Sequence, residues 1–325
     1  MSGPAVLVTG GAGYIGSHTC KALHAAGYTP VAFDNLVAGH REAVRWGPFE
    51  YGDVANRARL DEVLLTYRPR AALHFAAHAY VGESMANPGK YYRNNAVGSL
   101  TLLEALRDHG VRDLVFSSSC AVYGVPETVP ITEDTPTDPI NPYGMSKLVV
   151  ERMLRDFQSA HDLRWVALRY FNAAGADPAG EIGEDHDPET RVIPLALFAA
   201  AGKCGAFRVF GSDYPTPDGT CIRDYIHVSD LAGAHVRALA ALQAGLAPAA
   251  LNLGVGHGSS VKDIICTVEQ VTGLPVPVVN DARRPGDPAV LVADASQARR
   301  LLDWAPSHGS LAEIVETAWN WHRHR

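Results

Sequence analysis

Short apolar runs alternate with longer amphipathic stretches along the first half of the chain. The run Ala5–Thr9 (AVLVT) is almost continuously apolar, which is typical of a strand buried on both faces of a parallel sheet. Runs of the same kind predict further strands at residues 30–33, 71–75, 113–117 and 164–169. Helical stretches are predicted between or after them at residues 15–27, 89–109 and 143–161. This alternation predicts an α/β fold with a Rossmann-type doubly wound parallel sheet and right-handed crossovers.

The pattern changes after about Asn172. Segments rich in Gly, Asp and Pro, which we interpret as loops, dominate to about Asp224, and neither a flexible linker nor an internal repeat is visible. We therefore predict a second, smaller unit packed on the first, with the ligand site between them at the carboxyl ends of the strands. The predicted division is a NAD-binding Rossmann domain at 1–172, which also receives segments around 222–253, and a smaller C-terminal α/β substrate-binding lobe at 173–325.

A glycine-rich turn joins the first predicted strand to the first predicted helix. Gly10, Gly13 and Gly16 stand three residues apart, and glycine lets backbone N–H groups approach a pyrophosphate at the positive end of a helix. Asp34 ends the second strand, where a carboxylate hydrogen-bonds the adenosine ribose and repels a 2′-phosphate. The next two residues supply no compensating arginine. The sequence therefore predicts NAD rather than NADP. A chance glycine turn would lack this order of strand, helix, strand and Asp.

Tyr143 and Lys147 are four residues apart in a predicted helix, so their side chains lie on one face. An ammonium group and the positive nicotinamide ring both favour phenolate, which lets a phenol with a pKa near 10 act as a base near neutral pH. Ser119 closes the strand that begins at Asp113 and can hydrogen-bond the same substrate oxygen. Each residue alone is ordinary on a protein surface. Behind a dinucleotide motif they predict proton transfer coupled to hydride transfer at an alcohol carbon.

Composition is that of an ordinary globular enzyme of 325 residues, 47% of them hydrophobic. No apolar stretch reaches the roughly 18 residues that span a bilayer, and we expect a cytoplasmic protein without a signal peptide. A formal charge of −7 without a Lys/Arg tract disfavours nucleic acid and membrane as partners. The five cysteines form no C-x-x-C pair, so neither zinc nor a disulfide framework is indicated, and we predict no metal.

The motifs together resemble the extended short-chain dehydrogenase/reductase family over essentially the whole chain, and within it the UDP-glucose 4-epimerases (UDP-galactose 4-epimerases). Such enzymes keep NAD bound, oxidise the C4 hydroxyl of a UDP-sugar, let the 4-ketosugar turn over and return the hydride to its opposite face. Besides the glycine and Tyr–Lys motifs, the resemblance rests on the segments DNL at 34–36, HFAA at 74–77, VGES at 81–84, YYRNN at 91–95, FSSS at 116–119, VYG at 122–124, RYFN at 169–172 and GTCIRDYIHV at 219–228.

The resemblance implies individual roles. Tyr143 would take and return the proton of the C4 hydroxyl, Lys147 would lower the pKa of Tyr143 and hydrogen-bond the nicotinamide ribose, and Ser119 would hold O4. The implied NAD contacts, with Asp53 at the adenine, are Gly10, Gly13, Tyr14, Ile15, Gly16, Asp34, Asn35, Asp53, Val54, Phe75, Ala76, Ala77, Asn94, Ser117, Tyr143, Lys147 and Tyr170. The implied UDP-sugar contacts are Ser119, Tyr143, Asn172, Val192, Arg223, Arg284, Asp287 and Leu291.

Among these, Arg223 and Arg284 would hold the pyrophosphate, since a guanidinium fork suits phosphate oxygens, although an arginine taken alone more often forms a surface ion pair. Asp287 would take the uridine ribose. Leu291 stands where the family carries Tyr or a small residue, a position that controls access of 2-acetamido sugars. Arg191 occupies a position often held by a short amide. These departures leave the identity of the sugar open. The predicted substrates are UDP-glucose and UDP-galactose. The alternative is UDP-xylose and UDP-arabinose, or both pairs.

Two other classes on the same fold are less favoured. A sugar-nucleotide 4,6-dehydratase needs an acid beside the serine to eliminate water, and Cys120, Ala121 and Val122 follow Ser119 instead. A non-catalytic NAD-binding regulator need not retain the three proton-transfer residues that this chain has. The resemblance further implies a homodimer, formed by two long helices from each subunit at about residues 89–109 and 143–161.

Overall fold

The computed structural model describes residues 3–284 and 287–325 and is built on a seven-stranded sheet in which every pair of neighbours is parallel. The strand order is β3-β2-β1-β4-β5-β6-β11, so the order reverses between β1 and β4, as in dinucleotide-binding folds. This confirms the predicted doubly wound sheet. Its strands are β1 (Ala5–Thr9), β2 (Thr29–Asp34), β3 (Phe49–Tyr51), β4 (Ala71–His74), β5 (Asp113–Ser119), β6 (Arg164–Tyr170) and β11 (Ala249–Leu253).

Helices cover both faces of this sheet. Val6 and Val8 of β1 face one core cluster, shared with α1 and α8, whereas Leu7 faces a second cluster formed with α2, α5 and α6. Because successive side chains of a strand point to opposite faces, burial on both sides explains the continuous apolar runs. These helices are α1 (Tyr14–Ala25), α2 (Arg57–Tyr67), α5 (Gly98–Asp108), α6 (Pro142–His161) and α8 (Val228–Gln243). Within the described ranges, no helix is both long enough and apolar enough to cross a membrane.

The segment predicted as one helix at residues 89–109 consists of three joined pieces. Asn87 caps the first piece by accepting a hydrogen bond from the Lys90 amide, and Pro88 occupies its first turn. A π-helical turn follows before the regular helix α5 begins, and such turns are frequent at functional sites. The pieces are α4 (Pro88–Tyr91), η2 (Tyr92–Val97) and α5, and a short helix that we did not predict, α3 (Val81–Ala86), precedes them.

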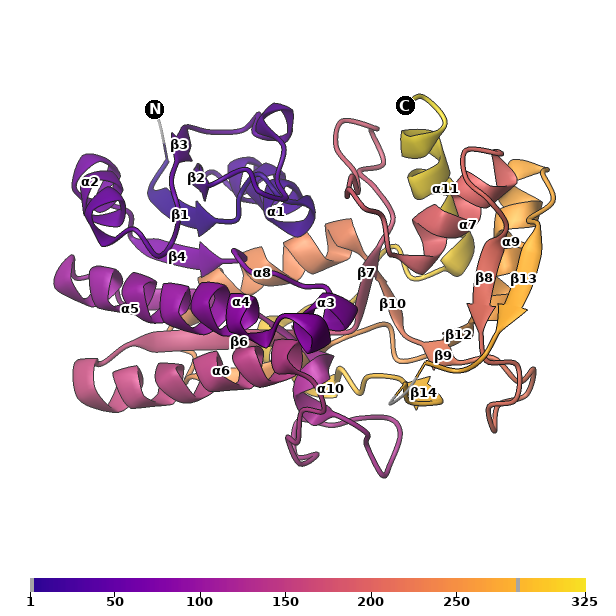
Figure 1. Ribbon diagram of the computed structural model, residues 1–325. Helices are drawn as coiled ribbons and strands as arrows, with labels where there is room; N and C mark the ends of the chain where they lie inside the picture. The colour runs from indigo at the N-terminus through magenta and orange to yellow at the C-terminus, as the bar shows by residue number, and fades with distance from the viewer. Residues whose placement is uncertain (1–2, 285–286) are drawn as a thin grey trace.

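A smaller group of elements lies apart from the sheet, on the right of Figure 1, where α7, α9 and α11 pack against a two-stranded parallel sheet of β8 and β13. Two of these elements fall between Asn172 and Asp224, where we interpreted the sequence as loops. That interpretation is wrong for α7 and β8, because frequent Gly and Pro hid two short apolar elements. The bounds are α7 (Val192–Ala200), β8 (Phe207–Phe210), α9 (Val261–Thr272), β13 (Val278–Asp281) and α11 (Leu311–His322).

The remaining elements are short, and among them α10 packs against α8 and β11 of the large sheet. β7 pairs with β10, and β9 pairs with both β12 and β14. They are η1 (Arg41–Ala43), η3 (Cys120–Tyr123), β7 (Asn172–Ala174), β9 (Ile222–Arg223), β10 (Tyr225–His227), β12 (Ser259–Ser260), β14 (Val290–Leu291) and α10 (Ser296–Leu302). The division of the chain into two domains at residue 172 stays a proposal; limited proteolysis that releases two stable fragments at that boundary would support it.

Candidate active site

The glycine turn forms a backbone cradle between β1 and α1. Gly10 has φ +73°, and a Cβ there would lie 2.6 Å from the amide nitrogen of Ala76, while a Cβ on Gly16 would lie 2.0 Å from the carbonyl oxygen of Gly10. Only glycine fits these two positions. Among the described residues no side chain caps the start of α1, which leaves the N–H groups of its first turn, from Tyr14 and Ile15 onward, available to an anion. The cradle therefore fits a pyrophosphate.

Asp34 ends β2 beside this cradle. Its carboxylate is buried and accepts hydrogen bonds from the backbone N–H groups of Ala12 (3.0 Å) and Leu36 (2.8 Å). Burial raises the pKa of Asp34, and these N–H groups counteract that shift. The next side chain, Asn35, donates a hydrogen bond of 2.8 Å to Asp53. A carboxylate fixed at this point fits an adenosine ribose, with Asn35 and Asp53 beside it.

The other residues predicted to contact NAD follow the neighbouring strands. Val54 is buried against the start of α5, and residues 75–77 come directly after β4. Asn94 lies in the π-helical turn and donates to Asn95 at 2.9 Å. Ser117 and Tyr170 share a hydrogen bond of 2.5 Å between β5 and β6. Because all of these strands are parallel, their carboxyl ends meet at one edge of the sheet, where the cradle also lies.

Tyr143 and Lys147 stand one turn apart at the start of α6, where Asn141 caps the helix by accepting a hydrogen bond of 2.8 Å from Gly144. Both side chains are buried, and the Lys147 ammonium lies 5.9 Å from the centre of the Tyr143 ring. Lys147 also donates a hydrogen bond of 2.7 Å to the carbonyl oxygen of Ser117. Ser119 closes β5, and its hydroxyl accepts from the amide of Ala121 at 3.2 Å. The sheet edge thus carries the predicted proton-transfer residues next to the nucleotide cradle.

The charges around Tyr143 include one that the sequence did not predict. Burial raises the pKa of Tyr143, while the Ser119 hydroxyl and the Arg191 guanidinium lower it. Burial also lowers the pKa of Lys147 to about 7, against the opposing effect of Glu151. Arg191 is therefore a cation that favours the phenolate of Tyr143 in the protein alone, and the lowering of the Tyr143 pKa by Lys147 stays a prediction. A bound cationic nicotinamide ring, which NAD would supply, would lower the Tyr143 pKa further.

Sequence reasoning noted Arg191 only as a departure and gave it no role. It stands at the N-cap of α7, where its backbone N–H donates to the carboxylate of Glu189 at 2.8 Å. Its guanidinium nitrogen Nε lies 3.7 Å from Oε1 of Glu184. The sequence did contain a signal for a role of Arg191. Next to the predicted sugar contact Val192, a long cationic side chain stands where the family often has a short amide.

A second feature that the sequence did not reveal lies beneath the catalytic helix. Glu151 of α6 and Arg169 of β6 form an ion pair with hydrogen bonds of 2.9 and 2.5 Å, and both side chains are fully or almost fully buried. Ser118 donates to Glu151 at 2.6 Å, and Arg169 donates to Tyr123 at 2.9 Å. This network joins β5, β6 and α6, so it holds the helix that carries Tyr143 against the sheet.

On the opposite side of the site, the structure brings three predicted substrate residues together. Arg223 pairs with Asp287 at 2.5 Å, and Leu291 of β14 lies opposite Arg223 in the pairing of β9 with β14. Leu291 and Cys120 both pack against the cluster that includes Val122. The guanidinium of Arg223 suits a phosphate group, and the neighbouring carboxylate of Asp287 suits a ribose hydroxyl.

The other predicted substrate residues are placed individually. Asn172 donates to the carbonyl oxygen of Asp224 at 3.1 Å, and Val192 begins α7 next to Arg191. The Arg284 guanidinium lies 4.0 Å from the centre of the Phe210 ring. Residues 285 and 286, between the two substrate residues of that loop, lie outside the described residues.

Comparison with known proteins gives a consistent result. The family model described as "NAD dependent epimerase/dehydratase family" matches residues 6–254. A UDP-glucose 4-epimerase of Rhizobium leguminosarum bv. trifolii is 55% identical over 99% of this chain and 98% of its own length. A crystal structure of UDP-glucose 4-epimerase from Brucella ovis in complex with NAD is 53% identical with a TM-score of 0.96 over 97% of each chain. UDP-glucose-4-epimerase from Stenotrophomonas maltophila, solved with bound NAD and formylated UDP-arabinopyranose, is 42% identical with a TM-score of 0.95 over 99% of this chain and 98% of its own.

Proposed function

Since this chain belongs to the NAD-dependent epimerase/dehydratase family, we propose that it is a UDP-glucose 4-epimerase that interconverts UDP-glucose and UDP-galactose through a transient 4-ketosugar. The family resemblance read from the motifs is confirmed by these matches. The observation that carries the function is the meeting of Tyr143, Lys147 and Ser119 with the glycine cradle at one sheet edge. NAD is the cofactor, and it supplies a hydride acceptor when bound.

The protein's own residues provide binding, orientation and proton transfer. Tyr143 takes the proton of the C4 hydroxyl as that carbon is oxidised and returns a proton when the ketone is reduced. Ser119 hydrogen-bonds O4 and holds it next to the Tyr143 hydroxyl. Lys147, fixed by its bond to the carbonyl oxygen of Ser117, orients the nicotinamide ribose. Arg223 and Arg284 hold the pyrophosphate and Asp287 the uridine ribose, which leaves the 4-ketosugar free to present either face.

Incubation of the purified protein with UDP-glucose and no added NAD tests this function. We expect UDP-galactose to accumulate towards equilibrium, with no net consumption of UDP-sugar. Parallel incubations with UDP-xylose and UDP-N-acetylglucosamine measure the sugar range. Formation of a 4-keto-6-deoxy sugar, or no conversion of any UDP-sugar, would show that the assignment is wrong.

Dehydration is disfavoured by the residue that follows Ser119. A 4,6-dehydratase needs a carboxylic acid there to protonate the leaving hydroxyl. Cys120 occupies the position, and burial raises the pKa of its thiol to about 12, so it is a poor proton donor at neutral pH. A purely regulatory NAD-binding role is disfavoured because Ser119, Tyr143 and Lys147 are all present and lie together.

We expect NAD to remain bound through purification. The epimerase cycle regenerates the oxidised cofactor, and the buried Asp34 carboxylate and close-packed glycine cradle favour its retention. Heat denaturation followed by enzymatic assay of the supernatant should release NAD. Recovery of NADP, or of no nucleotide from an active preparation, would contradict the role of Asp34.

Leu291 should act as a size filter for the substituent at C2 of the sugar. It lies opposite Arg223 and packs on the same cluster as Cys120, the residue that follows Ser119. We expect UDP-glucose and UDP-galactose to be good substrates and N-acetylated sugars to be poor ones. Leu291→Ser should raise the activity on UDP-N-acetylgalactosamine, relative to that on UDP-galactose, by between about 10-fold and about 200-fold. This range corresponds to about 1–3 kcal/mol of steric discrimination. Equal wild-type rates on UDP-galactose and UDP-N-acetylgalactosamine would overturn this assignment.

The same proposal extends to assembly and location. Tyr92, Val97 and Leu100, on the π-helical turn and α5, are large apolar side chains left exposed, which supports a homodimer formed through the region of α5 and α6. Figure 1 shows these two helices side by side.

We place the enzyme in the cytoplasm, where nucleotide sugars are its substrates, and propose neither nucleic acid nor membrane as a partner. Sedimentation velocity and cell fractionation would test the two statements.

A further inference from the structure

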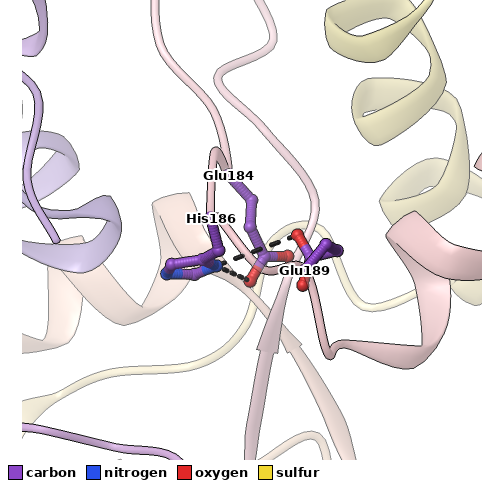
Figure 2. A group of neighbouring side chains, drawn as sticks. All are labelled: Glu184, His186 and Glu189. Carbon is purple, nitrogen blue, oxygen red and sulfur yellow. Dashed lines mark ion pairs between the residues drawn. The ribbon is translucent and has the colours of Figure 1, made fainter.

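Two carboxylates and an imidazole converge in the loop between β7 and α7. Figure 2 shows Glu184, His186 and Glu189 directed towards one another from this loop. His186 Nδ1 lies 3.2 Å from Oε1 of Glu184 and 3.9 Å from Oε2 of Glu189, and one ligand atom from each residue lies within 4.8 Å of the others. None of these three side chains has a role in the proposed epimerase reaction.

These converging atoms lack hydrogen-bond partners among the described residues. The side chains of Glu184 and Glu189 are only 3% and 6% exposed, yet Oε1 of Glu184 and Oε2 of Glu189 accept no hydrogen bond there, and His186 Nδ1 makes none. A buried carboxylate oxygen left without a partner is costly. The ligand oxygens of Glu184 and Glu189 also lie within 4.8 Å of each other, so the two carboxylates repel. A positively charged group is therefore favoured between the carboxylates of Glu184 and Glu189.

The surrounding contacts hold the cluster in place. The other oxygen of Glu189 accepts hydrogen bonds from the N–H groups of Thr190 (2.7 Å) and Arg191 (2.8 Å), so that Oε2 is turned towards His186. The rings of Tyr14 and Tyr80 pack edge-on against His186, each with centroids 6.2 Å apart. Ligands of a metal site are commonly fixed by such outer contacts.

We propose that Glu184, His186 and Glu189 bind one divalent transition-metal cation of the Zn²⁺ type. Two atoms bound to one tetrahedral zinc ion lie about 3.3–3.4 Å apart, so the 3.2 Å pair already fits and the 3.9 Å pair needs a small side-chain movement. The two carboxylate oxygens lie within 4.8 Å of each other and would have to approach by up to about 1.5 Å. One imidazole with two carboxylates suits zinc, which takes water as a fourth ligand. The guanidinium of Arg191, 3.7 Å from Glu184, offsets only one of the two negative charges.

This site differs from the sequence prediction of no metal, which rested on the absence of a cysteine pair. Glutamate and histidine at positions 184, 186 and 189 give no familiar spacing, and only the fold of the loop brings them together. A cation here would tie down the segment that ends at Arg191, the residue whose charge lowers the pKa of Tyr143. Its binding does not depend on the epimerase assignment.

Zinc titration of the metal-stripped full-length protein tests the proposal. After treatment with EDTA and its removal, isothermal titration with Zn²⁺ should show one site per chain, and Zn²⁺ should raise the thermal midpoint by several degrees more than Mg²⁺. His186→Phe keeps a ring against Tyr14 and Tyr80 but removes the nitrogen ligand. It should weaken zinc binding by more than about 100-fold, since even outer contacts contribute about 10–100-fold.

Glu184→Gln gives an independent test if His186→Phe folds poorly, and it should also lose the site. Asp185→Asn is the matched control, because Asp185 is part of the same loop but pairs with Arg325, and its zinc binding should equal that of the wild type. No zinc binding by the wild type, or equal binding by the wild type and both ligand variants, would overturn the proposal. Equal binding would assign the zinc to surface histidines or cysteines instead.

Discussion

Replacing Tyr143 with phenylalanine should lower epimerase turnover by about 10²–10⁴-fold, the usual contribution of a positioned acid–base group. The ring is 9% exposed, and phenylalanine keeps its packing while removing only the hydroxyl, so folding and NAD content should stay unchanged. Turnover is measured as conversion of UDP-galactose to UDP-glucose, and NAD by release on denaturation. Near-normal epimerisation by Tyr143→Phe would show that another group moves the C4 proton.

The pH dependence of turnover identifies the cation that acts on Tyr143. Loss of a positive charge raises the pKa of a phenol, so the phenolate forms at higher pH and the rising limb of the pH–rate profile moves to alkaline values. Arg191→Gln should produce this shift, because Arg191 is the charge that lowers the Tyr143 pKa in the structure. Lys147→Met should slow turnover and also shift the profile if Lys147 acts as the family resemblance implies. A shift with Lys147→Met alone would contradict the role given to Arg191.

The sheet and the nucleotide cradle could be predicted because their signals are local. Burial on both faces of the sheet requires continuous apolar runs such as Ala5–Thr9, and the tight turn at Gly10 leaves no room for a side chain. Asp34 follows from the same logic, since it ends the strand next to the cradle. The Tyr143–Lys147 pair is equally local, because helical spacing alone places two side chains on one face.

Features that depend on long-range placement could not be predicted. Glu151 and Arg169 meet across 18 positions only because α6 packs on β6, and nothing in the local sequence marks either residue as buried. Arg191 comes near enough to Tyr143 to lower its pKa because of how α7 is placed, although the sequence between Asn172 and Asp224 was interpreted as loops. Short elements framed by Gly and Pro carry too few residues for a periodic pattern to show.

Glu151→Ala should destabilise the protein by about 3–5 kcal/mol, because it leaves the Arg169 guanidinium buried without its partner. The pair is almost completely removed from solvent, and Glu151 also accepts the Ser118 hydrogen bond, so water does not replace the lost contacts. Urea unfolding followed by circular dichroism measures the change. Arg237→Ala on α8, which removes an exposed ion pair with Asp303, is the matched control and should cost less than about 1 kcal/mol.

The double variant Glu151→Met/Arg169→Met separates burial of an unpaired charge from loss of packing. If the cost of Glu151→Ala comes mainly from the orphaned guanidinium, the double variant should be more stable than the single one, because it removes both charges and fills the space with apolar atoms. Its α6 should then still present Tyr143 and Lys147, with measurable turnover. A double variant as unstable as Glu151→Ala would instead show that the hydrogen bond from Ser118, which both variants lose, holds the catalytic helix on the sheet.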